Sequence, residues 1–256
     1  MKGGDLVLKA FDSLGGSPTE AVMAAGSFDT TAGWIRSQTA QAAAIGAGTM
    51  IIPGVHLLAF GLDLGLVMHK VAYTTWGVGR LHECTIDGKL DLALVLAVWT
   101  NTIDDAMLTR AAEVSALGME VGQYVIGGPT AFLVYLISEV SGESATTILA
   151  TLGAMGGLVT AGRTADFLVG KAAEHSLPYY GKKIMTKISA KVAAKLASAT
   201  AGKLIPIVGA VVTATVNAII VRTVGAAAIR FYTAKRIALA ARQAIPRQIG
   251  PDHLGG

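Results

Sequence analysis

Three long stretches of the chain contain no formally charged residue, and they limit what the chain can fold into. The stretches are Ser37–Leu62, Val121–Ser138 and Ser144–Gly162, which are 26, 18 and 19 residues long. A membrane-crossing helix needs about 20 such residues. Each stretch also contains a helix breaker, either a proline or a pair of glycines, so closely packed helices explain it about as well. Both interpretations stay open at this point.

The composition favours helices over sheets. Hydrophobic residues make up 52% of the 256 residues, whereas aromatic residues make up 6% and charged residues 15%. Most of the apolar content is Ala, Val, Leu, Ile and Gly, which is typical of closely packed helices. We therefore predict an all-α fold, a compact multi-helix bundle of Gly/Ala-rich apolar helices that is either soluble or partly embedded in a membrane. More than about 65% of residues should be helical, with no sheet larger than an isolated hairpin.

Apolar spacing and helix breakers divide the chain further. Two helices should meet at Pro53, and their membrane version is a re-entrant hairpin. Amphipathic spacing predicts one helix from Leu90 to about Met119. The predicted regions are 1–36 with short helices, 37–240 as the main helical domain and 241–256 as a flexible tail.

Charge is distributed unevenly along the chain. Residues 1–174 contain 9 Lys and Arg against 16 Asp and Glu, a net charge of −7, whereas residues 175–256 contain 12 against 1, a net charge of +11. The basic part needs a negative partner, and the candidates are anionic lipid, nucleic acid and the protein's own acidic part. We expect no nucleic acid, because the lysines lack aromatic interleaving, a recognition helix and zinc-finger spacing.

The clearest amphipathic helix lies between Lys182 and Lys203. Its apolar positions repeat every four residues from Ile184 to Leu196, and a stripe of lysines runs parallel to them. Such a stripe is a solvated face, a docking surface for anionic lipid, or a contact for an acidic protein partner. The residues predicted to face a membrane surface are Lys182, Lys183, Lys187, Lys191, Lys195 and Lys203.

The segment from Leu204 to Tyr232 carries a specific pattern. A Pro-x-Val-Gly turn at Pro206 is followed by Val-Asn-Ala around Asn217, an Arg five residues later and a closing Ala-x-Arg-x-Tyr. This pattern resembles the C-terminal signature of the EcsC family, and the stretch from Pro53 to Gly77 is similar to an earlier block of that family.

The resemblance implies a class of protein and a place in the cell. Members of the family are bacterial proteins of unassigned biochemical activity, and one is encoded beside an ABC transporter. They are expected to be helical and to associate with the cytoplasmic side of the membrane. A membrane transport or secretion protein is therefore expected as a partner, beside the anionic membrane surface that the lysine stripe predicts.

Two polar residues interrupt the most apolar helix. Asn217 and Arg222 would each cost several kcal/mol if buried without a partner, so we expect both to be buried and hydrogen-bonded. One hypothesis is a structural network in which Arg222 pairs with Asp63 or Asp104. Another is a site for a ligand headgroup, made by Asp63, His69, Asn217 and Arg222. A third is acid–base catalysis by Asp63 or His69.

No catalytic motif, cofactor site or metal site is predicted. His56, Asp63 and His69 share one predicted helix, but His69 lies about 120° around it from Asp63, so one metal cannot bind all three. The tripeptide from His82 to Cys84 is expected in a solvent-exposed loop. The sequence therefore favours a membrane-associated accessory protein. The alternatives are a module that binds lipid or another hydrophobic ligand and, less favoured, an uncharacterised hydrolase.

Overall fold

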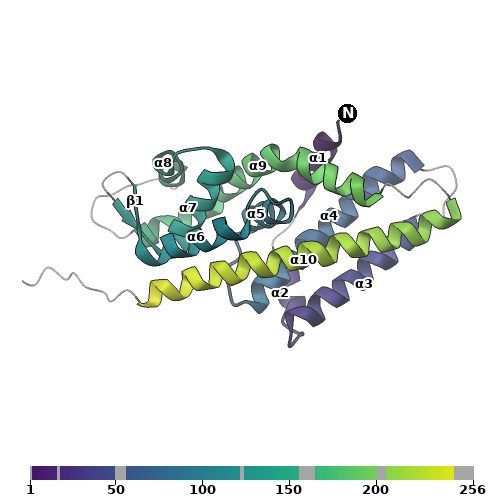
Figure 1. The fold of residues 1–256 in the computed structure, drawn as a ribbon, viewed down its shortest axis with the longest axis horizontal. Coiled ribbons are helices and arrows are strands. Elements are labelled where there is room, and N and C mark those ends of the chain that lie inside the picture. The colour runs from purple at the N-terminus through teal and green to yellow at the C-terminus, as the bar shows by residue number, and fades with distance from the viewer. Residues whose placement is uncertain are drawn as a thin grey trace, which may run out of the picture.

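The computed structural model describes residues 2–15, 18–49, 56–121, 124–155, 165–200 and 206–244, and it is 83% helical (Figure 1). The described residues form ten helices: α1 Gly3–Ser13, α2 Thr19–Ala25, α3 Thr31–Thr49, α4 His56–Leu81, α5 Lys89–Trp99, α6 Asp105–Leu117, α7 Gly128–Ser141, α8 Ala145–Met155, α9 Ala165–Thr200 and α10 Pro206–Ala244. Strands β1 Met119–Val121 and β2 Tyr124–Ile126 pair as an antiparallel hairpin. The prediction of an all-α fold is confirmed.

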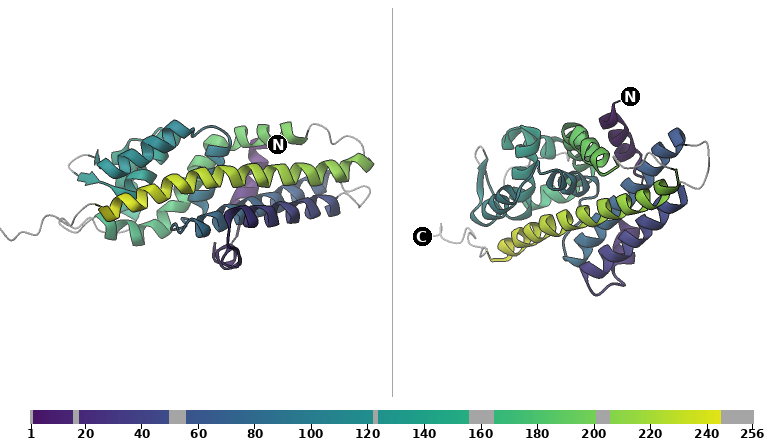
Figure 2. Two further views of the ribbon diagram at one scale, coloured as in Figure 1. Left: turned by 60° about the horizontal axis from the view of Figure 1, so that its bottom comes forward. Right: turned by 45° about the vertical axis from the view of Figure 1, so that its right-hand side comes forward.

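Helix α10 runs along most of the length of the molecule, and the other helices pack on its two halves (Figures 1 and 2). Its first half contacts α3 and α4, and the contact with α4 continues as far as Tyr232. Where α10 packs against α3, a Cβ atom on Gly225 would lie 2.9 Å from Ile35, so the missing side chain lets α3 approach closely. Its second half contacts α6 and α7, where Phe231 packs on Phe132 with ring centroids 5.8 Å apart.

Helix α4 carries two glycines that admit large aromatic side chains. A Cβ atom on Gly77 would lie 2.2 Å from Trp34 of α3, and one on Gly79 would lie 2.6 Å from Tyr232 of α10. The buried indole of Trp34 also donates a hydrogen bond to the carbonyl oxygen of Thr74, at 3.1 Å. These contacts join α3, α4 and α10 into one packed unit.

Helix α5 forms the centre of the other half, because every residue from Leu90 to Trp99 is buried. It contacts α9, α10 and α4, and α9 in turn contacts α1, α8 and α7. Helices surround α5 on all sides, so its sequence is apolar all round and not along one stripe.

The single helix predicted from Leu90 to about Met119 is wrong, since α5 ends at Trp99 and α6 begins at Asp105. Asn101 adopts a left-handed φ of 53°, and the Asp104 side chain accepts a hydrogen bond from Met107 N at 2.8 Å, which caps α6. The following uncharged stretch contains β2 and then α7, which begins with Pro129 in its first turn.

The C-terminal end of α3 and the N-terminal ends of α4 and α10 lie at the same end of the molecule (Figures 1 and 2). We define the hairpin end as residues Ser37–Thr49, His56–His69 and Pro206–Val221. Asp63 is its one formally charged residue. The connecting segments 50–55, with Pro53, and 201–205, with Lys203, lie outside the described residues, as does 245–256 within the predicted tail.

One stretch among the described residues is long and apolar enough to cross a membrane. It comprises Ala214–Ala240 of α10, and half of it is buried within the protein. Core helices of soluble proteins have the same length and composition, so this observation alone is weak evidence for a span.

Candidate functional site

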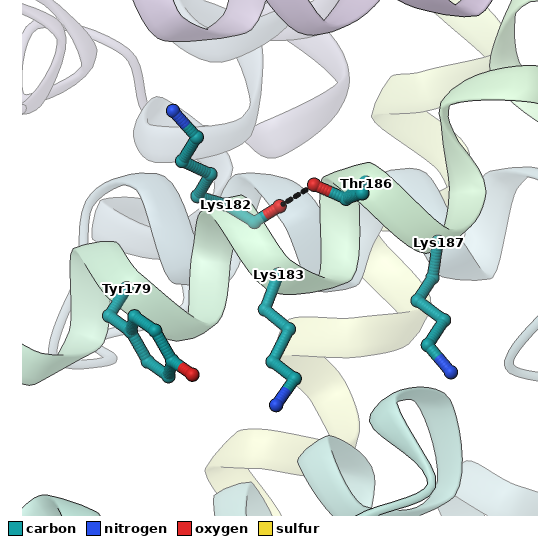
Figure 3. Close-up of a pocket in the computed structure, with 5 residues that line it drawn as sticks. All are labelled: Tyr179, Lys182, Lys183, Thr186 and Lys187. Atoms are coloured by element: carbon teal, nitrogen blue, oxygen red, sulfur yellow. Dashed lines mark hydrogen bonds between the residues drawn. The ribbon is translucent and has the colours of Figure 1, made fainter.

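The predicted basic helix forms the C-terminal part of α9. Ile184, Ile188 and Val192 are buried against the rest of the bundle, as the four-residue spacing predicts. Tyr179, Lys183 and Lys187 project from one side of α9, whereas Lys182 projects from the other (Figure 3).

A pocket of about 390 Å³ lies over this part of α9. It is a broad, open depression at the surface. Its lining consists of Tyr179, Lys182, Lys183, Thr186 and Lys187 (Figure 3). The ammonium groups of Lys183 and Lys187 lie on one side of this depression and suit an anion, and a phosphate group on a lipid or a free phosphate has the required chemistry.

Two of these lysines already have partners inside the protein. Lys182 donates to the Asp12 carboxylate of α1 at 2.9 Å, and Lys183 forms an ion pair with Glu143, beside the C-terminal end of α7. The hydrogen bond to Glu143 raises the pKa of the Lys183 ammonium. Both lysines therefore hold α9 against neighbouring helices.

The next two lysines contact the C-terminal end of α5. Lys191 donates to the Thr102 hydroxyl at 3.2 Å, and Lys195 donates to the Trp99 carbonyl oxygen and lies 4.8 Å from the centroid of its indole. A cation at the C-terminal end of a helix donates a hydrogen bond to a terminal carbonyl oxygen and interacts favourably with the helix dipole. Lys187 is exposed and forms no ion pair with a described residue, and Lys203 lies outside the described residues.

The uneven charge distribution is partly balanced by contacts within the protein, because five of the twelve cations in 175–256 form ion pairs in the part of the chain that the structure describes. Apart from the local pair Arg110–Glu113, every ion pair among the described residues joins a cation from 175–256 to a carboxylate from 1–174. The five cations are Lys182, Lys183, Arg230, Lys235 and Arg236. Of the three negative partners predicted from the sequence, these cations contact the protein's own acidic part.

The two polar residues predicted to be buried in α10 differ in exposure. Asn217 is buried and has an interaction partner, as predicted. The prediction for Arg222 is wrong, because this residue is exposed and forms no ion pair with a described carboxylate. Five residues turn an α-helix by about 140° beyond one full turn, so Asn217 and Arg222 occupy different faces of α10. They cannot form one site on this straight helix.

The remaining predicted site residues do not complete a cluster around Arg222. Asp104 caps α6, and its neighbour Asp105 pairs with Arg230 at 2.5 Å. His69 is exposed, and its ring lies 5.8 Å from that of Tyr73. The side chain of Asp63 lies outside what the structure describes.

A buried ionic network joins α5 and α10, and it includes residues that the sequence analysis did not select. Lys235, 1% exposed, donates to Asp87 Oδ2 at 2.6 Å and to both oxygens of Asp91 at 2.8 and 3.0 Å. Asp91, with 0% exposure, also accepts from the Tyr232 hydroxyl and from the backbone N–H of Asp87, both at 3.0 Å. We call Asp87, Asp91, Tyr232 and Lys235 the buried network.

Burial shifts the titration of this network. It raises the pKa of Asp91 to about 6, and the positive charge of Lys235 limits the rise. Burial also lowers the pKa of Lys235, but the two carboxylates outweigh it, so that pKa is raised overall. Burial and the neighbouring carboxylate raise the pKa of Tyr232 well above its usual value. The positive charge of Lys235 therefore favours the ionised form of Asp91, and the surroundings favour the neutral form of Tyr232.

Cys84 lies beside the buried network, contrary to the prediction of an exposed loop. Its side chain is buried, and its thiol donates weakly to the Tyr232 carbonyl oxygen at 3.6 Å. Burial raises the pKa of this thiol to about 11. The loop after α4 folds back onto α10, and that long-range contact is invisible in the local pattern.

The described residues contain no cluster of metal-ligating side chains, since no group of three His, Cys, Asp or Glu side chains among them is placed to hold a metal ion. Within the buried network, Lys235 and Asp91 are almost completely enclosed by protein and pair their charges with each other. Comparison of the chain with models of known families, with curated proteins and with solved structures found no match.

Proposed function

We propose that this protein is a membrane-associated helical accessory protein that binds an anionic surface on the cytoplasmic side of a bacterial membrane. The hairpin end is the observation that carries this proposal. Three helices bring their uncharged ends together there, with Asp63 as the one formal charge in the defined ranges. A water-exposed end of a soluble protein would be expected to carry many more charges.

Large apolar side chains at the hairpin end support the proposal. Leu66 of α4 is 43% exposed and Ile219 of α10 is 50% exposed. Burial of apolar surface in lipid is favourable at about 25 cal/mol per Å². The unpaired cation Lys187 would add an attraction to anionic lipid of about 1 kcal/mol. The resemblance to the EcsC family agrees with this proposal and suggests a membrane transport or secretion protein as the partner.

The alternative of a module that encloses a hydrophobic ligand receives less support. An apolar gap between α4, α5, α9 and α10 has a volume of about 10 Å³ and is lined by residues such as Met68, Leu96 and Val224. Pockets for small molecules usually have volumes of about 300–1,000 Å³. This gap would have to open widely before it could hold a lipid.

Vesicle flotation tests the proposal directly. Purified protein is mixed with vesicles of phosphatidylcholine alone or with added phosphatidylglycerol, and the floating fraction is measured at low and high salt. We expect flotation with the anionic vesicles, reduced by salt because screening weakens the charge attraction. Lys187→Gln should weaken binding about fivefold, whereas Arg110→Gln on α6 should not change it. Protein that stays in the dense fraction with both kinds of vesicle would contradict the proposal.

A further inference from the structure

Three cations lie at nearly the same level around the three-helix unit of α3, α4 and α10. Arg36 follows Ile35, which meets Gly225 of α10, and Arg222 lies three residues before that glycine. From α4, the Lys70 ammonium donates to Gln38 at 3.4 Å and to Gln41 at 2.5 Å, both on α3. At 1.5 Å per residue, these contacts place the three positive groups within about 8 Å of one another along the bundle axis.

These cations have no carboxylate partner among the described residues. Arg36 and Arg222 are exposed and form no ion pair, and Lys70 contacts amide oxygens instead of a carboxylate. The cations in the second half of α10 whose side chains the structure describes behave differently, since Arg230, Lys235 and Arg236 are all paired. The positive charges of these three residues are therefore available to a negatively charged partner outside the protein.

The character of the surface changes at this level. Exposed Leu66 lies four residues from Lys70, and exposed Ile219 lies three residues from Arg222, each on the side of the hairpin end. On the other side, Arg230 pairs with Asp105 in a hydrated, charged surface. An apolar end bordered by unpaired cations matches the change from hydrocarbon to anionic headgroups in a bilayer.

We propose that Arg36, Lys70 and Arg222 form a cationic belt that binds the headgroups of anionic lipid, with the hairpin end inserted part-way into the bilayer. This inference rests on the proposed function and adds the face, orientation and depth of binding. From Arg222 to Pro206, α10 extends about 24 Å at 1.5 Å per residue. That length exceeds one leaflet of a hydrocarbon core about 30 Å thick but does not cross the whole core.

The same geometry argues against Ala214–Ala240 as a membrane span. The middle of that stretch lies beyond the belt, and its far part contains Tyr232 and Lys235, which are buried against α5. A span there would require these helices to separate and leave Asp91 without its cation. Insertion up to the belt keeps the buried network intact.

Probes at two positions on one face of α10 can measure how deeply this helix enters the bilayer. Ile219 and Ala226 are both exposed, lie seven residues apart and straddle Arg222. A cysteine at either position is labelled with an environment-sensitive fluorophore, and the parent protein, with its buried Cys84, is the labelling control. The vesicles contain phosphatidylcholine and phosphatidylglycerol, with a nitroxide quencher on the acyl chains.

We expect the probe at Ile219→Cys to shift to the blue and to be quenched, whereas the probe at Ala226→Cys stays in water. The double variant Arg36→Gln/Arg222→Gln should bind these vesicles about 30-fold more weakly, from about a fivefold effect for each cation. Arg110→Gln, with the same change of charge on α6, should bind like the parent.

Each other outcome has a definite meaning. Protein that floats with neither probe quenched would overturn the belt and leave the proposed function with another docking surface. Quenching of both probes would also overturn it, because α10 would then enter the bilayer beyond Arg222. Absence of flotation would contradict the proposed function itself.

Discussion

Replacing Lys235 by Met would test the buried network most directly. Lys235 supplies the positive charge for Asp87 and for Asp91, and Asp91 has no exposed surface. The methionine side chain fills much of the same volume but leaves these carboxylates without a cation. Tyr232 and the backbone N–H of Asp87 still donate to Asp91, so the charge is not wholly unsolvated.

Removing one partner of a buried ion pair costs about 3–5 kcal/mol, and we expect a loss in the free energy of unfolding near the lower limit. Urea denaturation followed by circular dichroism measures this loss. Lys187→Met is the matched control, because Lys187 is exposed and forms no ion pair with a described residue. It should change stability by less than about 0.5 kcal/mol.

The effect of Lys235→Met should depend on pH. Without the positive charge, the pKa of Asp91 should rise above about 6, further above the value in the unfolded chain. A raised pKa contributes stability at low pH that is lost as pH rises through the folded-state pKa. The stability gap between variant and parent should therefore narrow at about pH 5 compared with about pH 8. The reasoning would be refuted if the difference in unfolding free energy between variant and parent were below about 1 kcal/mol, or if it did not change with pH.

Two further predictions concern close packing and the thiol. Gly77→Ala should destabilise the protein by about 1–3 kcal/mol because its Cβ would overlap Trp34, whereas Gly65→Ala, with open space around it in the same helix, should stabilise it by up to about 1 kcal/mol. Thermal unfolding of both variants checks this contrast, and equal effects would contradict it. Cys84 should react with a thiol reagent much more slowly in folded than in urea-unfolded protein, because burial raises its pKa from 9.0 to about 11. The stability that this shift contributes should be lost between those two pH values, and rapid labelling of the folded protein would contradict the prediction.

Apolar spacing was sufficient to predict the fold class and the inner face of α9. The positions from Ile184 to Val192 recur every four residues, and that periodicity depends on the helix alone. The break between α5 and α6 was missed because α5 is apolar on all sides, so no change of stripe marks its end. Only the left-handed Asn101 and the cap at Asp104 separate the two helices.

The candidate sites were harder to predict, for two different reasons. The separation of Asn217 from Arg222 follows from helix geometry, since five residues place them on different faces, and the sequence contained that information. The pairing of Asp91 with Lys235 needs the tertiary contact of two segments 144 residues apart. A signal existed in each segment, because Asp91 interrupts an apolar run and Lys235 lies at helical spacing from the apolar residues Ala228, Phe231 and Ala238. Neither signal identified the partner.

The buried network also bears on the surface proposed to meet lipid. Lys235 and Asn217 are 18 residues apart, which is five turns of helix, so both lie on the buried face of α10. Holding Lys235 against Asp91 therefore sets the rotation of the whole helix. That rotation places Ile219 and Arg222 on the exposed face of α10. The paired cations of the basic C-terminal part thus orient α10 within the protein, and this orientation leaves Arg222 unpaired at the border of the hairpin end.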